Sequence, residues 1–446
     1  MKTIRIATGA GYAGDRLEPA LEAMEKGNID YISFECLAER TIAIAQQAKL
    51  KDPSKGYNGL LEYRMEKVLP LAKEKGIKVI TNMGAANPER AAEVCVQIAE
   101  AYGITGLKIA AVTGDDVADI LDKYDDTIVW ETKAPLKELE GIVSANVYMG
   151  SEGIVEALRQ GADVVITGRV ADPAIFMAPI IYEFGWEMDD WDRLGKGTQL
   201  GHLLECGAQV TGGYYSEPGK KDVPHPERLG FPIAEVSEDG SFFITKVEGS
   251  GGVVDVHTCT EQLLYEIHDP SSYITPDVIA DFSKTTFEET SKDVVQVGGA
   301  TGRERPDTLK VSIGYLDCFI GEGYMSYGGP GAYERARLAA DIVLKRLELR
   351  GIAIDELKVD ILGHDSIYWN SERAPVPSAP EYRLRVAGRT KDRTSASRIA
   401  EEVEALYTNG PAGGCGAVKS VQEIVSVASI LIDRKDVTPH VVIKEV

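Results

Sequence analysis

Two side chains able to bind and move charge follow the most strand-like run of the sequence. Val164 to Thr167 is entirely β-branched, and Arg169 and Asp172 come directly after it. A guanidinium presents paired N–H donors that suit a carboxylate or phosphate. We therefore expect Arg169 to hold an anionic substrate group and Asp172 to take part in the chemistry. The alternative is that Arg169 and Asp172 pair with each other or cap the following helix.

A second charged group follows the strand expected at 31–34. Glu35, Cys36, Glu39 and Arg40 lie just beyond that strand, at the start of a helical pattern. Burial raises the pKa of a carboxyl group, so Glu35 or Glu39 is expected to act as a general base, with Arg40 binding substrate. The alternative is that Glu35 or Glu39 pairs with Arg40 and stabilises the helix start. Cys36 lacks a histidine nearby in sequence, which disfavours a reactive thiol.

The third strand, expected at 78–81, ends in a polar loop. Asn82, Gly84 and Asn87 precede Pro88, which opens the next helix at its first turn. Side-chain amides and backbone N–H groups suit a carboxylate or carbonyl oxygen. Asn82 and Asn87 are therefore expected to bind substrate.

Glycines follow the first strand in the order G-x-G-x-x-G. Gly9, Gly11 and Gly14 fit a dinucleotide fingerprint and are also expected to bind substrate if the loop lies at the same sheet edge. Asp15, however, would occupy the positive helix end where a pyrophosphate must sit. The sequence favours a tight turn with a helix cap, no tightly bound nicotinamide and no cofactor.

A second glycine-rich stretch runs from Gly321 to Gly331 and enters a long helical pattern. It is expected to be a loop whose N–H groups face an anion, or one that needs glycine for close packing. It lacks the Lys and Ser/Thr of a P-loop, so nucleotide triphosphate hydrolysis is not indicated.

One helix face carries His202 and Glu205, at positions i and i+3. A metal site needs a third and usually a fourth ligand, and nothing nearby has ligand spacing. A histidine hydrogen-bonded between helices is the preferred interpretation, and no metal is expected.

Alternating β-rich runs and amphipathic segments position these residues. They predict an α/β fold, with a doubly wound, mostly parallel sheet in a Rossmann-like domain over 1–215 and an α+β domain over 216–446. A (β/α)8 barrel is the alternative and needs two more units. The expected strands of the first domain are 3–8, 31–34, 78–81, 107–112, 142–147 and 163–167. In a parallel sheet, the loops after these strands meet at one edge, where ligands bind.

Composition limits the partners. The chain has 446 residues, 44% apolar, and a net charge of −22, which repels nucleic acid and anionic lipid surfaces. Six scattered cysteines without a C-x-x-C pair suggest neither a zinc ribbon nor a disulfide framework. No apolar run has the length of a signal peptide core or of a membrane span. A cytoplasmic location is expected.

Several separated segments resemble one family, the acyclic terpene utilisation (AtuA) family. These segments are IDYISFECLAERTIA, VITGRVADPAIF, GHLLECGAQVTGG, EQLLYEIHDP with YITPDVIADF, and YGGPGAYERARLA. The resemblance covers nearly the whole chain and implies a place in the degradation of branched, acyclic isoprenoid acids as coenzyme A thioesters. It supplies no role for individual residues. Longer relatives carry an additional small C-terminal domain, which leaves room for a separate small partner protein.

The leading hypothesis is an enzyme acting on a small carboxylate or acyl-coenzyme A thioester by proton abstraction or hydration. Arg169 would hold the anionic group and Glu35 or Glu39 would move the proton. A non-catalytic acyl-coenzyme A binding or assembly subunit is the alternative, and a dinucleotide-dependent oxidoreductase is the third. A homo-oligomer is expected in each case.

Overall fold

The protein is described by a computed structural model over residues 2–367 and 379–446. Its chain forms two compact units, Met1–Gly314 with Val427–Val446, and Tyr315–Ser426. The boundary expected near residue 216 falls inside the first unit. The reason is that strands beyond residue 216 pair with the first strand of the chain and extend the same sheet.

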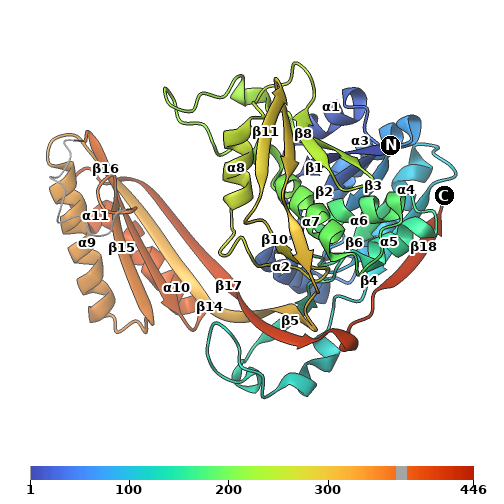
Figure 1. Ribbon diagram of the computed structural model, residues 1–446. Helices are drawn as coiled ribbons and strands as arrows, with labels where there is room; N and C mark the ends of the chain where they lie inside the picture. Colours follow the sequence, from blue (N-terminus) through green and yellow to red (C-terminus); the bar gives the residue numbers. More distant parts are fainter. Residues whose placement is uncertain (1, 368–378) are drawn as a thin grey trace. The chain divides into compact units, whose positions relative to one another are not determined.

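Five parallel strands form the centre of the first unit (Figure 1). In spatial order they are β1 (Thr3–Ala10), β2 (Tyr31–Phe34), β3 (Lys78–Thr81), β6 (Val164–Thr167) and β4 (Lys108–Thr113). The central strands β2 and β6 are buried along their whole length, which explains their unbroken apolar character. The prediction that the runs at 3–8, 31–34 and 164–167 are parallel strands of one sheet is confirmed.

Antiparallel strands extend this sheet on both sides. β7 (Pro232–Ser237), β8 (Phe242–Lys246), β12 (Val294–Gly298) and β11 (Thr286–Ser291) continue outward from β1, and β18 (His440–Glu445) pairs with β4. The described strands thus make a ten-stranded, mixed and open sheet, in contrast to the closed barrel that was the alternative. The fold is mixed α/β, and the doubly wound arrangement stays a prediction.

The strand expected at 142–147 forms but does not join this sheet. β5 (Ile142–Val147) pairs instead with the long strand β14 (Thr308–Gly328). A three-stranded sheet of β9 (Tyr273–Ile274), β10 (Ile279–Asp281) and β13 (Thr301–Arg303) completes the strands of this unit.

The helices between the strands are amphipathic or wholly buried. In α5 the apolar residues at 154, 155, 157 and 158 are buried, whereas α6 is apolar and buried from Ala174 to Ile181. The helices of the first unit are α1 (Glu18–Lys26), α2 (Glu39–Lys51), α3 (Leu61–Lys75), α4 (Pro88–Ala101), α5 (Glu152–Arg159), α6 (Ala174–Phe184), α7 (Trp191–Glu205) and α8 (Val256–Leu264). None of the described helices is long and apolar enough to cross a bilayer.

The second unit has its own core, between one sheet and helices α9 (Ala332–Leu349), α10 (Arg393–Glu404) and α11 (Leu406–Asn409). Its strand order is β15 (Glu356–Leu362), β16 (Glu381–Thr390), β14 and β17 (Cys415–Asp433). Residues 321–328 belong to β14, so most of the expected second glycine loop is a strand. A Cβ at Gly321 would lie 1.9 Å from the carbonyl oxygen of Ala396, which shows that glycine is needed there for close packing on α10.

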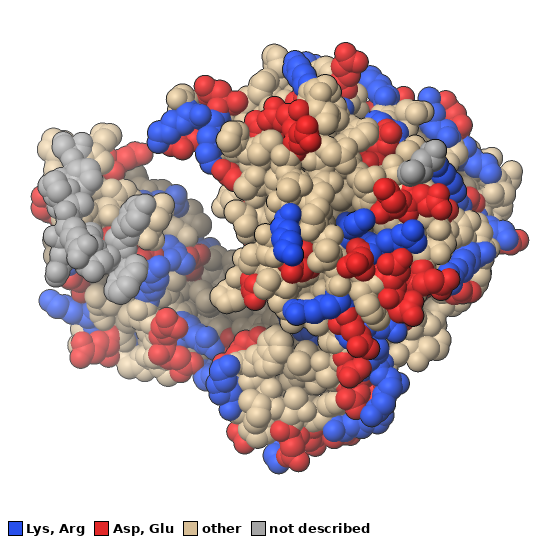
Figure 2. All heavy atoms as spheres, in the orientation of Figure 1, with Lys and Arg blue, Asp and Glu red and all other residues tan. Residues whose placement is uncertain are grey.

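Acidic and basic side chains are interspersed over the face of the molecule drawn in Figure 2. The whole chain carries a net charge of −22.

Candidate functional site

A cavity of about 1080 Å³ lies within the first unit, where the loops after β1, β2 and β6 meet the end of α7. All four residues expected to be catalytic, Glu35, Glu39, Arg169 and Asp172, line it. The predicted common edge therefore exists, and the chemistry of these residues has to be judged together.

The turn after β6 is held in place by a buried carboxylate from the loop after β4. Asp115 Oδ2 accepts hydrogen bonds from the backbone N–H of Arg169 and from Asn146 Nδ2, both at 2.9 Å. A Cβ at Gly168 would lie 2.3 Å from Asp115 Oδ1, so only glycine fits against this carboxylate. Burial raises the pKa of Asp115 to about 6. Asp115 thus positions Arg169 from outside the cavity, a role that sequence reasoning did not assign.

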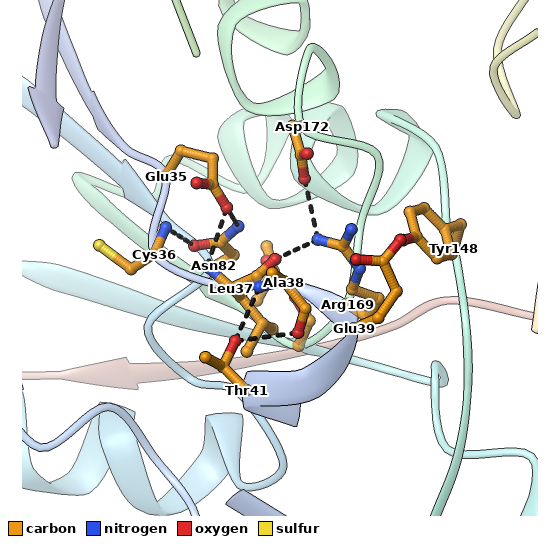
Figure 3. Close-up of polar contacts among 12 residues, drawn as sticks. Glu35, Cys36, Leu37, Ala38, Glu39, Thr41, Asn82, Tyr148, Arg169 and Asp172 are labelled. Carbon is orange, nitrogen blue, oxygen red and sulfur yellow. Dashed lines mark hydrogen bonds and ion pairs between the residues drawn. The ribbon is translucent and has the colours of Figure 1, made fainter. Parts of the chain in front are cut away.

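Arg169 is 2% exposed and makes three close contacts (Figure 3). Its Nη1 donates to Asp172 Oδ1 at 2.8 Å and to the carbonyl oxygen of Leu37, and its guanidinium lies 4.0 Å from the ring centroid of Tyr148. Burial opposes the charge, but Asp172 and Tyr148 more than offset it, and the pKa of Arg169 lies above its ordinary value. The pairing with Asp172 that was the structural alternative is therefore present, in a residue that also faces the cavity.

Glu35 is buried at the cavity wall and is held by two donors. Its Oε1 accepts hydrogen bonds from the backbone N–H of Leu37 at 2.8 Å and from Asn82 Nδ2 at 3.0 Å. Burial, followed by the charge of Asp172, raises the pKa of Glu35 to about 8, although Arg169 and the two donors act in the opposite direction. A carboxyl group with such a pKa is mostly protonated at pH 7 and loses its proton as the pH rises through 8, which lies close to the working range of a catalytic base.

Asp172 is open to the cavity although it lies deep in the protein. Its side chain keeps 35% of its surface exposed and lines the cavity. Burial of this site raises the pKa of Asp172, and the ion pair with Arg169 lowers it by less. Glu35 and Asp172 therefore compete for ionisation beside one guanidinium.

Glu39 has the opposite electrostatic environment from Glu35. It accepts a hydrogen bond from the hydroxyl of Tyr148, and Lys310 Nζ lies 3.3 Å from its Oε1. Burial raises its pKa, but the Tyr148 hydrogen bond and the charges of Arg169 and Lys310 outweigh burial and hold the pKa at about 2. Glu39 therefore stays ionised, and the proton-transfer role that was shared between Glu35 and Glu39 is better suited to Glu35.

The residues expected to bind substrate divide into two groups. Gly11 lines the cavity, whereas Gly9, Gly14, Asn82, Asn87 and Arg40 do not. Asn82 is fully buried and holds Glu35, with its Oδ1 accepting the Cys36 N–H at 2.7 Å. Asn87 Nδ2 donates to two loop carbonyls, those of Pro53 and Lys55. Arg40 is exposed at the start of α2. The ion pair with Glu35 or Glu39 that was the alternative interpretation is not among its contacts in the described part of the chain.

The loop at Gly9 to Gly14 is occupied by its own acid. Asp15 Oδ2 accepts the N–H of Gly11 at 2.8 Å and its Oδ1 accepts the N–H of Arg16 at 2.8 Å, while α1 begins only at Glu18. A Cβ at Gly11 would lie 2.4 Å from the carbonyl carbon of Cys206, and one at Gly9 would lie 2.6 Å from the ring of Phe34. Close packing against Cys206 and Phe34 thus explains why both positions are glycine, and no pyrophosphate is needed to explain them.

The Gly11→Ala variant should be less stable than the parent by roughly 1–3 kcal/mol, because the added methyl group meets backbone that cannot rotate away. Chemical denaturation measures the loss. Gly59→Ala is the matched control, since a Cβ there has nothing within 4 Å. Equal stability of the two variants would contradict the close packing of this loop.

Several cavity residues were missed by sequence reasoning or given no role. Tyr148 and Lys310 flank Arg169 and Glu39, and His202 and Glu205 reach the cavity from the last turn of α7. Gly201 permits this approach, because a Cβ there would lie 2.6 Å from the carbonyl oxygen of Pro173. The glycines at 195, 197 and 201 were the available signal that α7 packs closely on its neighbours, and the one at 201 packs on the turn after β6. Within the described residues, no group of three or more His, Cys, Asp or Glu has an arrangement that could hold a metal ion.

The comparisons with known proteins come to one clear match. The sequence model of the family described as "Acyclic terpene utilisation family protein AtuA" matches residues 4–443. No curated protein matches the chain. Among solved structures, the chain is similar to the crystal structure of a putative oxidoreductase from Parabacteroides merdae, with 9% identity over 68% of this chain and 85% of that one. The TM-score is 0.10, so this likeness carries no argument.

Proposed function

The chain belongs to the acyclic terpene utilisation (AtuA) family, and from that premise we propose that it is an acid–base enzyme acting on a small carboxylate or acyl-coenzyme A thioester. Glu35 removes a proton from the carbon next to the carbonyl group. The reaction class is proton abstraction, either alone or as part of a hydration or dehydration. A cytoplasmic homo-oligomer, with room for a small partner protein, belongs to the same proposal.

One observation carries this proposal: Glu35 is buried at the wall of a large cavity with its pKa raised to about 8. A general base is most effective when its pKa lies near the working pH. The two donors on Oε1 fix the orientation of the carboxyl group, which favours a defined direction of proton transfer.

Positive charge lies beside the proposed base. Arg169 and Lys310 both line the cavity and both lie over the ring of Tyr148, with the guanidinium 4.0 Å and the Lys310 Nζ 5.0 Å from its centroid. Removing a proton next to a carbonyl group places negative charge on its oxygen, which such cations stabilise. The same pair suits a substrate carboxylate in a protein that is otherwise strongly acidic.

Apolar side chains around the cavity support an apolar substrate chain. Trp130, Tyr214, Ile274 and Leu431 line the cavity and are exposed. Exposed apolar side chains that gather on a concave surface are typical of ligand sites. A branched hydrocarbon chain would cover them while its carbonyl end reaches Glu35.

The proposal is tested with the wild-type protein in deuterium oxide. 3-Methylbutanoyl-coenzyme A and free 3-methylbutanoate serve as probes, and NMR follows deuterium uptake at the carbon next to the carbonyl group. Uptake from either probe is expected to exceed the rate without protein. A thermal shift without uptake would instead indicate the acyl-coenzyme A binding subunit. Micromolar binding of a nicotinamide cofactor in calorimetry would promote the oxidoreductase.

A further inference from the structure

We infer that Glu205, oriented by His202, is a second proton-transfer group of this cavity and supplies the proton that a leaving hydroxyl group needs. The inference rests on the proposed function and makes it more specific, because it selects dehydration and hydration over simple proton exchange. It gives a role to the two α7 residues that sequence reasoning interpreted as a hydrogen-bonded histidine.

The hydrogen bonds around His202 determine where its protons lie. Nε2 lies 3.1 Å from the carbonyl oxygen of Leu263, which can only accept, so Nε2 must carry a hydrogen. Nδ1 lies 2.8 Å from Glu205 Oε1. One further proton therefore lies between Nδ1 and Oε1, giving either imidazolium with carboxylate or neutral imidazole with carboxylic acid. That proton stays between the two residues, so a proton released to substrate must be a second one, carried on Glu205 Oε2 while Oε1 accepts from the imidazolium Nδ1–H.

The second oxygen of Glu205, Oε2, is the atom that can carry this second proton and release it into the cavity. Glu205 is 6% exposed and lines the cavity, and its Oε2 is buried without a hydrogen-bond partner among the described residues. A buried carboxylate oxygen left unpaired is costly and calls for a partner that the protein itself does not supply. A substrate hydroxyl group in the cavity would satisfy it.

The surroundings keep the Glu205 proton available near neutral pH. Burial raises the pKa of Glu205 to about 7, against the effect of His202, and Asp172 and Glu266 add to the increase. Burial lowers the pKa of His202, but Glu205 outweighs it and the net shift is upward. The other groups facing the pair are Cys206 beside Glu205 in sequence and Tyr273, whose ring centroid lies 5.2 Å from that of His202.

The chemistry balances without a further reactant. Glu35 takes the proton from the carbon next to the carbonyl group, and the electron pair forms a carbon–carbon double bond as the neighbouring carbon–oxygen bond breaks. Glu205 gives the proton on its Oε2 to the departing hydroxyl group, which leaves as water, and His202 stays hydrogen-bonded to Oε1. Hydration runs through the same steps in reverse. Two carboxyl groups of raised pKa thus divide the work, Glu35 on carbon and Glu205 on oxygen.

The test separates the two proton transfers with one probe, 3-hydroxy-3-methylbutanoyl-coenzyme A. Deuterium uptake at the carbon next to the carbonyl group reports on Glu35, and formation of the unsaturated thioester reports on Glu205. In Glu205→Gln, water loss should fall by roughly 10²–10⁴-fold while deuterium uptake changes by less than about threefold. Glu35→Gln should lose both. His202→Asn should lower water loss by less than Glu205→Gln does, because it acts only through Glu205.

Each result decides something. Unchanged water loss in Glu205→Gln overturns the inference, as does an equal fall in both readings accompanied by a lower melting temperature, which indicates a structural role. If the wild-type protein shows neither reading, the proposed function fails and the inference falls with it. A fall in the His202 pKa in Glu205→Gln, followed by NMR of ¹⁵N-histidine, reports on the shared proton without any substrate. An unchanged His202 pKa would show that the pair holds no such proton.

Discussion

Replacing Glu35 with glutamine is expected to slow deuterium uptake from an acyl-coenzyme A probe by roughly 10²–10⁴-fold, the usual contribution of a general base. Glutamine keeps the oxygen that accepts from Leu37 and Asn82, so the fold should survive. In the wild-type protein, kcat/KM should increase with pH, and the midpoint of this increase should lie near pH 8, because Glu35 must lose its proton to act. Rates measured from pH 6 to 10 check both statements.

Stability should respond to the same carboxyl group. A folded-state pKa of about 8 lies above the ordinary value of 4.5, so Glu35 favours folding below pH 4.5 and this contribution is lost as the pH rises to about 8. The free energy of unfolding of Glu35→Gln should therefore fall less over that range than that of the wild type. Glu39→Gln is the matched control in the same cavity and should leave the kinetic midpoint near 8 unchanged, because Glu39 is already ionised. A midpoint below 6 in the wild type would exclude Glu35 as the base.

Removing the Arg169 charge should produce the second large effect. It should lower the stability of the protein and also shift the pH midpoint of kcat/KM. In Arg169→Met, Asp172 and the Leu37 carbonyl lose their donor. Breaking a buried ion pair typically costs about 3–5 kcal/mol, and we expect about 3 because Asp172 keeps 35% of its side chain open to the cavity. The kinetic midpoint should also move above 8, since Arg169 lowers the pKa of Glu35.

The control for this variant is Arg385→Met, which breaks ion pairs with Glu322 and Asp360 in the second unit. It should lower stability and leave the midpoint in place.

Arg169→Lys keeps the charge without the planar fork, so substrate affinity should fall by roughly 1–3 kcal/mol while the midpoint stays near 8. A lower melting temperature with unchanged affinity would limit Arg169 to a structural role.

The strands of the parallel sheet could be predicted from the sequence because their signal is local. The runs at 31–34, 78–81 and 142–147 are strands with those same bounds. β-Branched composition does not indicate which strand will be the partner. β5 has the same local signal as the other strands, but it pairs with β14 outside the ten-stranded sheet. Local composition likewise does not show that β7 pairs with β1 across more than half of the chain, which places residue 216 inside the first compact unit.

The candidate site followed in part from the rule that loops after parallel strands share one edge. That rule brought Glu35, Glu39, Arg169 and Asp172 to one cavity, where their roles stay predictions. Asn87 does not line the cavity, and its amide donates instead to carbonyls of the loop between α2 and α3. Lys310 and Glu205 come from a strand and a helix far along the chain, and only tertiary packing brings them to the cavity.

The pairing of β18 with β4 also orders events on the ribosome. β4 ends at Thr113, whereas β18 begins at His440, so the outer edge of the parallel sheet stays open while the intervening chain is translated. At roughly 5–20 residues per second, that interval is on the order of tens of seconds. An open strand edge is a template for pairing with other chains. A nascent polypeptide stalled before residue 440 therefore exposes β4 to its neighbours, however completely the rest of the sheet has formed.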